Sequence, residues 1–271
     1  MAGAPQRSGQ WAQWNRREFV SRWRDVEPSN GPVSETLFAA LKLQPGEHVL
    51  DIGCGGGQTT LDAAERVGAS GAATGFDISE PMLEIARERA RAHALGNVTF
   101  AAGDAQVESP PNGPFDAVMS RFGVMFFADP VAAFTNIRRQ LRPGGRIAFA
   151  SWQALGKNQW FPGAVLAKYR HGPPPDPGAP PQPGPFALAG EDYTRSILAA
   201  AGFTDISFHA HGYEWREPAK AVDGLLLEAM NLDTETKARA MADLEAHAAS
   251  MTVDGVIRQE RNYWIVTAAN G

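Results

Sequence analysis

The chain lacks the residues and segments of a disulfide-bonded or membrane-spanning protein. Cys54 is the only cysteine among 271 residues, which excludes an internal disulfide and a cysteine-based metal site. No apolar run reaches the roughly 18 residues that a transmembrane helix needs. Residues 1–7 also lack the apolar core of a signal peptide. We therefore expect a cytoplasmic protein with no membrane span and no bound metal ion.

The chain also lacks an excess of basic residues. Its 25 lysines and arginines are outnumbered by 30 aspartates and glutamates, so the formal net charge is −5. This balance argues against nucleic acid as a partner, because phosphate recognition favours a basic surface. A local cluster of arginines near the start is explained more simply as the solvated face of a short helix. A small molecule is the expected partner.

What the sequence does contain is a repeated alternation of strand and helix patterns. Such alternation predicts an α/β, Rossmann-like, doubly wound fold with a mostly parallel, seven-stranded sheet and helical lid insertions. Ligands of such sheets bind beyond the carboxyl ends of the strands. The expected strands are 48–52, 72–77, 98–102, 115–120, 146–151, 205–215 and 263–268, with helices over 58–67, 81–93, 130–141 and 191–201.

Three segments interrupt this alternation. Residues 1–34 have the pattern of short amphipathic helices, residues 153–190 include a proline-rich stretch, and residues 216–258 follow a helical pattern. We expect these segments to form a lid over the ligand-binding edge of the sheet. The predicted core then consists of residues 35–152, which bind the ligand, residues 191–215, and a final strand within 259–271.

The most informative motif is a predicted strand that ends in an acid and leads into a glycine-rich turn. It reads Asp51-x-Gly53-x-Gly55-x-Gly57, and a predicted helix follows at once. A turn this bare lets the backbone approach a ligand closely, and the helix start offers N–H groups to an anion. The dinucleotide fingerprint G-x-G-x-x-G fails, because Gln58 stands at its third glycine. An acid ahead of the glycines would repel a pyrophosphate but suit a cationic ligand.

Four patches of sequence carry a resemblance to a known family. They are residues 49–57 (VLDIGCGGG), 75–83 (GFDISEPML), 103–105 (GDA) and 141–146 (LRPGGR). On these patches the chain resembles the class I S-adenosylmethionine-dependent methyltransferases, of the type similar to ubiquinone and menaquinone biosynthesis methyltransferases. The resemblance is strongest over residues 47–152. It implies S-adenosyl-L-methionine as the cofactor and S-adenosyl-L-homocysteine as the product.

The resemblance implies roles for three acids. Asp51 would lie against the methionine part of the cofactor, Asp77 would accept hydrogen bonds from both ribose hydroxyls, and Asp104 would bind the adenine amine. A carboxylate is a natural acceptor for a diol or an amine. The alternatives are a helix-terminal acid for Asp77 and a turn-forming residue for Asp104. The other implied cofactor residues are Gly53, Gly55 and Gly57 in the turn, Ile78 and Met82 on the adenine face, the Ala105 N–H, and Ser120 at the fourth strand's end.

Catalytic residues are harder to predict than cofactor residues. Methyl transfer from a sulfonium is an in-line displacement, for which the protein mainly positions the acceptor and excludes water. An oxygen or acidic-carbon acceptor also needs its proton removed, and Tyr213 on the sixth strand is our candidate base. Arg121 is our candidate for binding a carboxylate of the acceptor or cofactor, with a structural salt bridge as the alternative. Aromatic residues in the predicted lid favour a small, partly apolar acceptor, methylated on O, C or N.

Other functions stay open from the sequence alone. An NAD-dependent oxidoreductase would use a similar sheet, although Gln58 argues against it. A non-catalytic protein that binds the same cofactor would keep the same motifs. A methyltransferase acting on a macromolecule is disfavoured by the acidic balance. The tryptophans Trp11 and Trp14 fit either lid packing or a homodimer contact.

Overall fold

The computed structural model of the protein describes residues 15, 20, 30–158, 160–169, 179–219, 227, 230 and 232–271. The chain divides into two compact units. The first consists of Met1–Trp152, Gln182–Ala210 and Tyr263–Gly271, and the second of Gln153–Pro181 and His211–Asn262. The predicted N-terminal lid therefore lies almost wholly outside the described residues.

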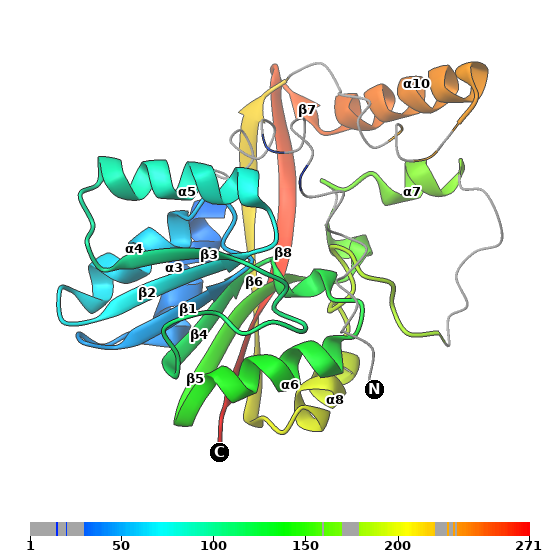
Figure 1. The fold of residues 1–271 in the computed structure, drawn as a ribbon. Coiled ribbons are helices and arrows are strands. Elements are labelled where there is room, and N and C mark those ends of the chain that lie inside the picture. Colours follow the sequence, from blue (N-terminus) through cyan, green and yellow to red (C-terminus); the bar gives the residue numbers. More distant parts are fainter. Residues whose placement is uncertain are drawn as a thin grey trace. The chain divides into compact units, whose positions relative to one another are not determined.

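The first unit is built on a mostly parallel sheet (Figure 1). Neighbouring strands follow the order β3-β2-β1-β4-β5-β8-β6, and β7 adds an eighth strand by pairing with β8. The predicted doubly wound, Rossmann-like sheet is confirmed, with one strand more than the seven expected. The strands are β1 (His48–Ile52), β2 (Ala72–Asp77), β3 (Val98–Ala102), β4 (Phe115–Arg121), β5 (Leu141–Trp152), β6 (Thr204–Pro218), β7 (Thr252–Val253) and β8 (Val256–Ala269).

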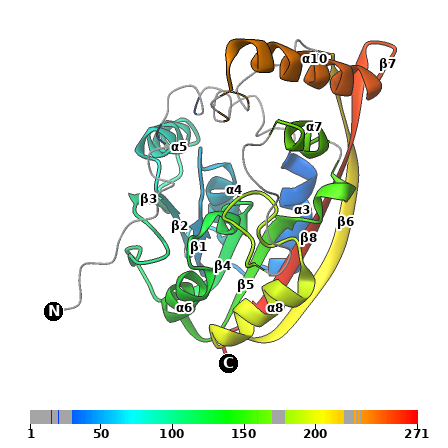
Figure 2. The same cartoon turned by 90° about the vertical axis from the view of Figure 1, so that its right-hand side faces the viewer.

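Helices cover both faces of this sheet. Figure 2 shows α3, α4 and α5 on one face and α6 and α8 on the other. Because both faces are covered, the central strands are apolar and buried along nearly their whole length. The sequence also sets the helix ends, since Asp129 caps α6 by accepting a bond from Ala132 N at 2.9 Å. The helices are α3 (Gly31–Leu41), α4 (Gln58–Val67), α5 (Glu80–Ala92), α6 (Pro130–Gln140) and α8 (Glu191–Ala200).

The described residues of the second unit include two α-helices and a hairpin. The hairpin joins β7 to β8 through Asp254 and Gly255, which both have positive φ, as a two-residue type I′ turn requires. The helices are α7 (Gly163–Ala167) and α10 (Thr234–Ser250). They pack through a small apolar cluster, and an ion pair joins Lys168 to Asp243 at 2.8 Å. The helical insertion predicted over 216–258 is helical only in part among the described residues: α10 begins after Asp233, whose carboxylate caps it, while residues 216–218 belong to β6, 252–253 to β7 and 256–258 to β8.

Among the described residues, none of the helices combines the length and apolar character needed to cross a membrane.

Candidate functional site

The glycine turn after β1 has a conformation that only glycine accommodates without strain. Gly53, Gly55 and Gly57 have φ values of +66°, +53° and +81°. A Cβ on Gly53 would lie 2.8 Å from the Cα of Gly123, and one on Gly57 would lie 2.7 Å from the Cβ of Ala86. The turn is thus packed tightly against β4 and α5. It delivers the chain into α4, whose first N–H groups face the carboxyl ends of the strands.

Asp51, on β1, is a buried carboxylate with one oxygen satisfied and one not. Its side chain is 1% exposed, and Oδ2 accepts hydrogen bonds from the hydroxyls of Thr59 and Thr60, both at 2.7 Å. Oδ1 finds no hydrogen-bond partner among the described residues. Burial raises the pKa of Asp51 to about 6, although the two hydroxyls and the charge of Arg121 oppose that rise. A buried, unsatisfied carboxylate oxygen is a good acceptor for a donor that a ligand brings.

Asp77, at the end of β2, closes the glycine turn from the neighbouring strand. Its Oδ2 accepts a hydrogen bond from Gly55 N, and its Oδ1 accepts one from Ser79 N, each at 2.8 Å. Burial raises the pKa of Asp77, and these backbone bonds oppose the rise. Asp77 precedes Ser79, the N-cap of α5, so it lies outside the first turn of that helix. Each oxygen retains a second lone pair with which a ribose hydroxyl could bond.

The predicted adenine residues surround the ends of β2 and β3. Met82 and Ala105 are buried, and Ile78 is half-buried. Asp104 is buried as well, and its Oδ1 accepts a hydrogen bond from Gln106 N at 2.9 Å. That bond is the one a turn-forming aspartate makes, so both interpretations of Asp104 stay open. The ligand contacts of these four residues remain predictions.

Ser120, at the end of β4, ties that strand to the glycine turn. Its side chain is fully buried; the hydroxyl donates to Ile52 O at 2.7 Å and accepts from Gly123 N at 3.2 Å. Since both bonds are made within the protein, the hydroxyl holds the turn against β4. This contact explains how Ser120 would act on a ligand through the backbone of the turn.

Arg121 is buried beside this edge and is held by a helix from outside the glycine motif. The side chain is 8% exposed, and its Nη1 donates a hydrogen bond to the Oγ of Ser34, on α3, at 2.7 Å. Both predicted roles of Arg121, binding a carboxylate of the acceptor or cofactor and forming a structural salt bridge, remain predictions. Its bond to Ser34 fixes the guanidinium at the carboxyl end of β4.

Aromatic rings line the same end of β4 and β5. Phe122 stacks on Trp152 with ring centroids 4.0 Å apart and an angle of 9° between the planes, and Tyr263 meets Phe122 edge-on at 6.4 Å. Phe122 has φ of +65°, a region that bulky residues rarely adopt and that is often found at functional sites. The hydroxyl of Tyr263 shares a hydrogen bond of 2.9 Å with Thr36. All three side chains are buried, so the rings form a packed apolar cluster near the glycine turn.

Tyr213, the candidate base, belongs to the second unit. It lies on β6 with a half-buried side chain. Its catalytic role remains a prediction.

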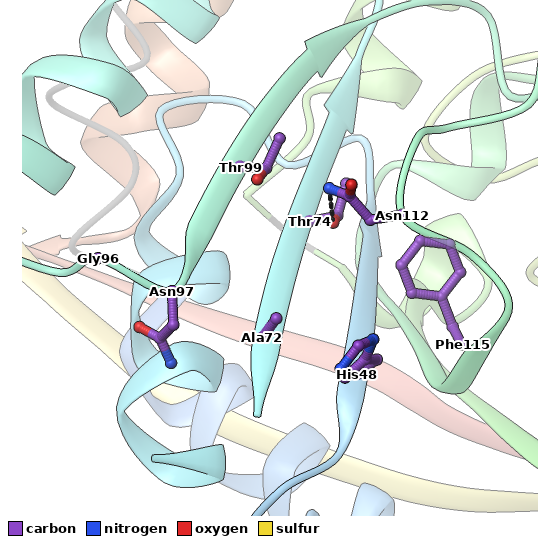
Figure 3. Close-up of a pocket in the computed structure, with 8 residues that line it drawn as sticks. All are labelled: His48, Ala72, Thr74, Gly96, Asn97, Thr99, Asn112 and Phe115. Carbon is purple, nitrogen blue, oxygen red and sulfur yellow. Dashed lines mark hydrogen bonds between the residues drawn. The ribbon is translucent and has the colours of Figure 1, made fainter. Parts of the chain in front are cut away.

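A cavity among the described residues lies at the opposite end of the sheet (Figure 3). It has a volume of about 290 Å³ and sits where β1, β2 and β4 begin. Thr74 and Asn112 face each other there across a hydrogen bond of 3.4 Å. Ligands of doubly wound sheets bind at the carboxyl ends, so we do not assign this cavity to the cofactor. Its lining consists of His48, Ala72, Thr74, Gly96, Asn97, Thr99, Asn112 and Phe115.

Sequence reasoning missed several residues that shape this site. Thr59 and Thr60 could have been found, because a helix that follows a strand across a tight turn must set its first side chains against that strand. Arg89 donates a hydrogen bond to Gly56 O at 3.0 Å, and Ser34 holds Arg121. These last two contacts join segments far apart in the sequence, and no local pattern indicates them.

Comparison with known proteins finds methyltransferases that are similar to part of this chain. A family model described as a methyltransferase domain matches residues 43–171. The aklanonic acid methyltransferase DauC of Streptomyces sp. (strain C5) is 43% identical over 120 residues, which are 44% of this chain and 54% of that protein. The demethylmenaquinone methyltransferase of Symbiobacterium thermophilum is 34% identical over 140 residues, 51% of this chain and 48% of that protein. The chain spans about half the length of these curated relatives.

A solved structure shares the fold. Phosphoethanolamine N-methyltransferase 2 of Haemonchus contortus, in complex with S-adenosyl-L-methionine, matches with a TM-score of 0.62 at 16% identity. The match covers 97% of this chain and 60% of that chain. At this level of identity the likeness extends to the fold alone.

Proposed function

We propose that this protein, whose residues 43–171 match a methyltransferase domain, is a class I S-adenosylmethionine-dependent methyltransferase and methylates a small, partly apolar molecule. The cofactor is S-adenosyl-L-methionine, and the product is S-adenosyl-L-homocysteine. One observation carries the proposal. A buried acid, Asp51, and a half-buried one, Asp77, stand at the ends of neighbouring strands on either side of a glycine turn, and Oδ1 of Asp51 lacks a partner among the described residues.

The residues of this edge fit the chemistry of an adenosyl sulfonium. The unsatisfied Oδ1 of Asp51 suits a cationic donor, and the glycines of the turn leave its backbone without side chains at Gly53, Gly55 and Gly57, where a ligand can approach closely. Asp77 offers carboxylate oxygens to a ribose diol. A pyrophosphate would instead place negative charge beside Asp51, which argues against the NAD-dependent alternative. Gln58, whose Nε2 donates to Asp62 at 2.8 Å, takes the position of the third dinucleotide glycine.

The protein's own contribution to the chemistry is placement. When bound, S-adenosyl-L-methionine supplies a methyl group that is already activated on a sulfonium sulfur. The glycine turn and the two acids hold the donor, and the buried Phe122–Trp152 stack makes the surroundings of the acceptor apolar. Bringing the reacting atoms to about 3–3.5 Å and excluding water can supply much of the acceleration. Tyr213 is proposed to take the acceptor's proton where the accepting atom is O or C.

The acceptor class follows from the site and from the relatives together. The rings beside β4 and β5 favour a partly apolar acceptor, and the relatives named above include methyltransferases of aklanonic acid and demethylmenaquinone. The net charge of −5 supports the proposal that no nucleic acid is involved. A homodimer rests only on Trp11 and Trp14, which lie outside the described residues.

The test is methyl transfer from methyl-labelled S-adenosyl-L-methionine to a panel of phenols, quinols, carboxylic acids and amines. We expect label to appear in at least one acceptor, together with stoichiometric S-adenosyl-L-homocysteine. Tight cofactor binding with no labelled product across the panel would favour the non-catalytic alternative. Binding of NADH in place of the cofactor would favour the oxidoreductase.

A further inference from the structure

The loop that follows β3 is folded back on itself by a buried aspartate. The Oδ1 of Asp104 accepts a hydrogen bond from Gln106 N at 2.9 Å, and its backbone carbonyl accepts from Val107 N at 3.0 Å and from Glu108 N at 2.7 Å. These bonds give the loop the compact form of a turn. The N–H of Ala105, in the same turn, has no hydrogen-bond partner among the described residues. Because Ala105 is buried, this N–H is a donor that a ligand could satisfy.

Helix α6 holds this turn from the side. Asn136 lies on α6, and its Nδ2 donates hydrogen bonds to Ala105 O at 3.0 Å and to Glu108 O at 2.8 Å. One amide group with two hydrogens therefore ties two carbonyls of the turn to the helix. A second contact joins the same elements, because Gln106 Oε1 accepts from the N–H of Asp129, the N-cap of α6, at 2.9 Å. The turn thus has two anchors on one helix.

The helix that carries these anchors is itself packed on the sheet. Phe134 and Ile137 of α6 are buried, and the ring of Phe134 lies 5.4 Å from that of Phe149 on β5, between centroids. A side chain on such a helix holds its partners more precisely than a loop does. The carbonyl and the N–H of Ala105 belong to rigid peptide planes that meet at one Cα. Holding the carbonyl therefore restricts the directions in which the N–H can point.

The ligand group that matches this N–H is a ring nitrogen with a free lone pair. Adenine has such a nitrogen next to its exocyclic amine, so an acceptor and a donor lie side by side. In hypoxanthine a carbonyl replaces the amine, and the adjacent ring nitrogen carries a hydrogen. The donor and acceptor are then exchanged. A turn that offers the Ala105 N–H beside the Asp104 carboxylate suits the first base and opposes the second.

We propose that Asn136 is a positioning residue for recognition of the adenine base of the cofactor. By tying the carbonyls of Ala105 and Glu108 to α6, it keeps the Ala105 N–H directed at the base. The inference rests on the proposed function, because it presumes that S-adenosyl-L-methionine binds at this edge of the sheet. Asn136 acts through the turn and needs no contact with the cofactor. Selectivity for adenine then depends on a helix residue 31 positions beyond Ala105.

The experiment compares two ligands by calorimetry. They are S-adenosyl-L-homocysteine and S-inosyl-L-homocysteine, which differ only in the base. Wild type should prefer the adenine ligand on the order of 10- to 100-fold, as for buried hydrogen bonds that are left unmatched. Asn136→Ala should bind the adenine ligand about tenfold more weakly and the hypoxanthine ligand about as wild type does. The preference itself should therefore shrink, which a general loss of stability would not cause.

The matched control is Asn97→Ala. Asn97 is half-buried like Asn136, and its Nδ2 also donates to backbone carbonyls, at 3.0, 3.0 and 3.3 Å. It lies just before β3, at the end of that strand opposite to the turn. This variant should keep the full preference for adenine. Asn136→Ser serves if Asn136→Ala fails to fold, because its short side chain cannot bridge both carbonyls, and it should reduce the preference several-fold.

The outcomes separate the inference from the proposed function. If Asn136→Ala, or Asn136→Ser in its place, prefers adenine as strongly as wild type, the inference is wrong and the methyltransferase proposal stands. An equal reduction in Asn97→Ala would likewise overturn it, because the effect would not be specific to the turn. Equal binding of both ligands by wild type would mean that the turn does not recognise the base. If wild type binds neither ligand, the proposed function itself fails.

Discussion

The difference in unfolding free energy between Asp51→Asn and wild type should favour the variant more at neutral pH than at acidic pH. Burial raises the pKa of this carboxyl from 3.8 to about 6, so the folded state holds the proton more tightly than the unfolded state. This proton contributes its full share to the unfolding free energy below the pKa that Asp51 has in the unfolded state, and the contribution is lost as pH rises through about 6. Asparagine carries no such proton, so its stability lacks this dependence.

The size of the effect follows from the shift in pKa. Two units at 1.36 kcal/mol each give about 3 kcal/mol over the whole titration, of which about 2 kcal/mol falls between pH 4.5 and 7.5. The unfolding free energy of Asp51→Asn minus that of wild type should therefore grow by about 2 kcal/mol across this range. Urea unfolding at several pH values measures it, and Asp254→Asn, in the exposed β7–β8 turn, is the control.

The result that would refute this reasoning is a difference that stays constant with pH. It would mean that Asp51 is charged as readily in the folded state as in the unfolded one, and that the buried Oδ1 is satisfied after all. A difference that falls with rising pH would mean that Asp51 is stabilised as an anion. In either case the carboxylate would no longer be a group in need of a ligand.

Three further predictions concern the same edge. Affinity for S-adenosyl-L-homocysteine should fall as pH drops through about 6, by up to tenfold per pH unit, because the ligand needs Asp51 ionised. Calorimetry from pH 5 to 8 measures this, and an affinity that does not change with pH would contradict it. Gly57→Ala should destabilise by about 1–3 kcal/mol more than Gly144→Ala, since both have positive φ but only the first Cβ meets a neighbour, at 2.7 Å. Equal losses in urea unfolding would contradict that packing. Tyr263→Phe should cost about 1 kcal/mol by removing the hydrogen bond to Thr36, and an unchanged unfolding midpoint would count against it.

The parts of the fold that the sequence predicts are those decided by local pattern. Short apolar runs between glycine or proline turns locate the parallel strands, and the acids Asp51 and Asp77 fall where such runs end. The lone Cys54 is buried, as its small apolar character suggests. In each case the preference of a few neighbouring residues agrees with the tertiary structure.

The parts that escape prediction depend on contacts between distant segments. The bond from Arg121 to Ser34 spans 87 residues, and neither residue stands out in its own neighbourhood. Phe122 has positive φ, which a bulky residue does not favour by itself, and its ring stacks on Trp152, which lies 30 residues further along the chain. The β7–β8 hairpin is different, since Asp254-Gly255 is a strong turn signal that the assignment of these residues to a helical insertion overlooked.

The most direct test of the central claim is the affinity of the purified protein for S-adenosyl-L-homocysteine, measured by calorimetry with two variants. Wild type should bind one equivalent, and Asp77→Asn should bind at least about tenfold more weakly, because an amide replaces one of the oxygens offered to the ribose hydroxyls. Asp129→Asn, which preserves the cap of α6, should bind as wild type does. No heat with wild type, or equal affinity for Asp77→Asn, would contradict the proposal that this edge of the sheet holds an adenosyl sulfonium.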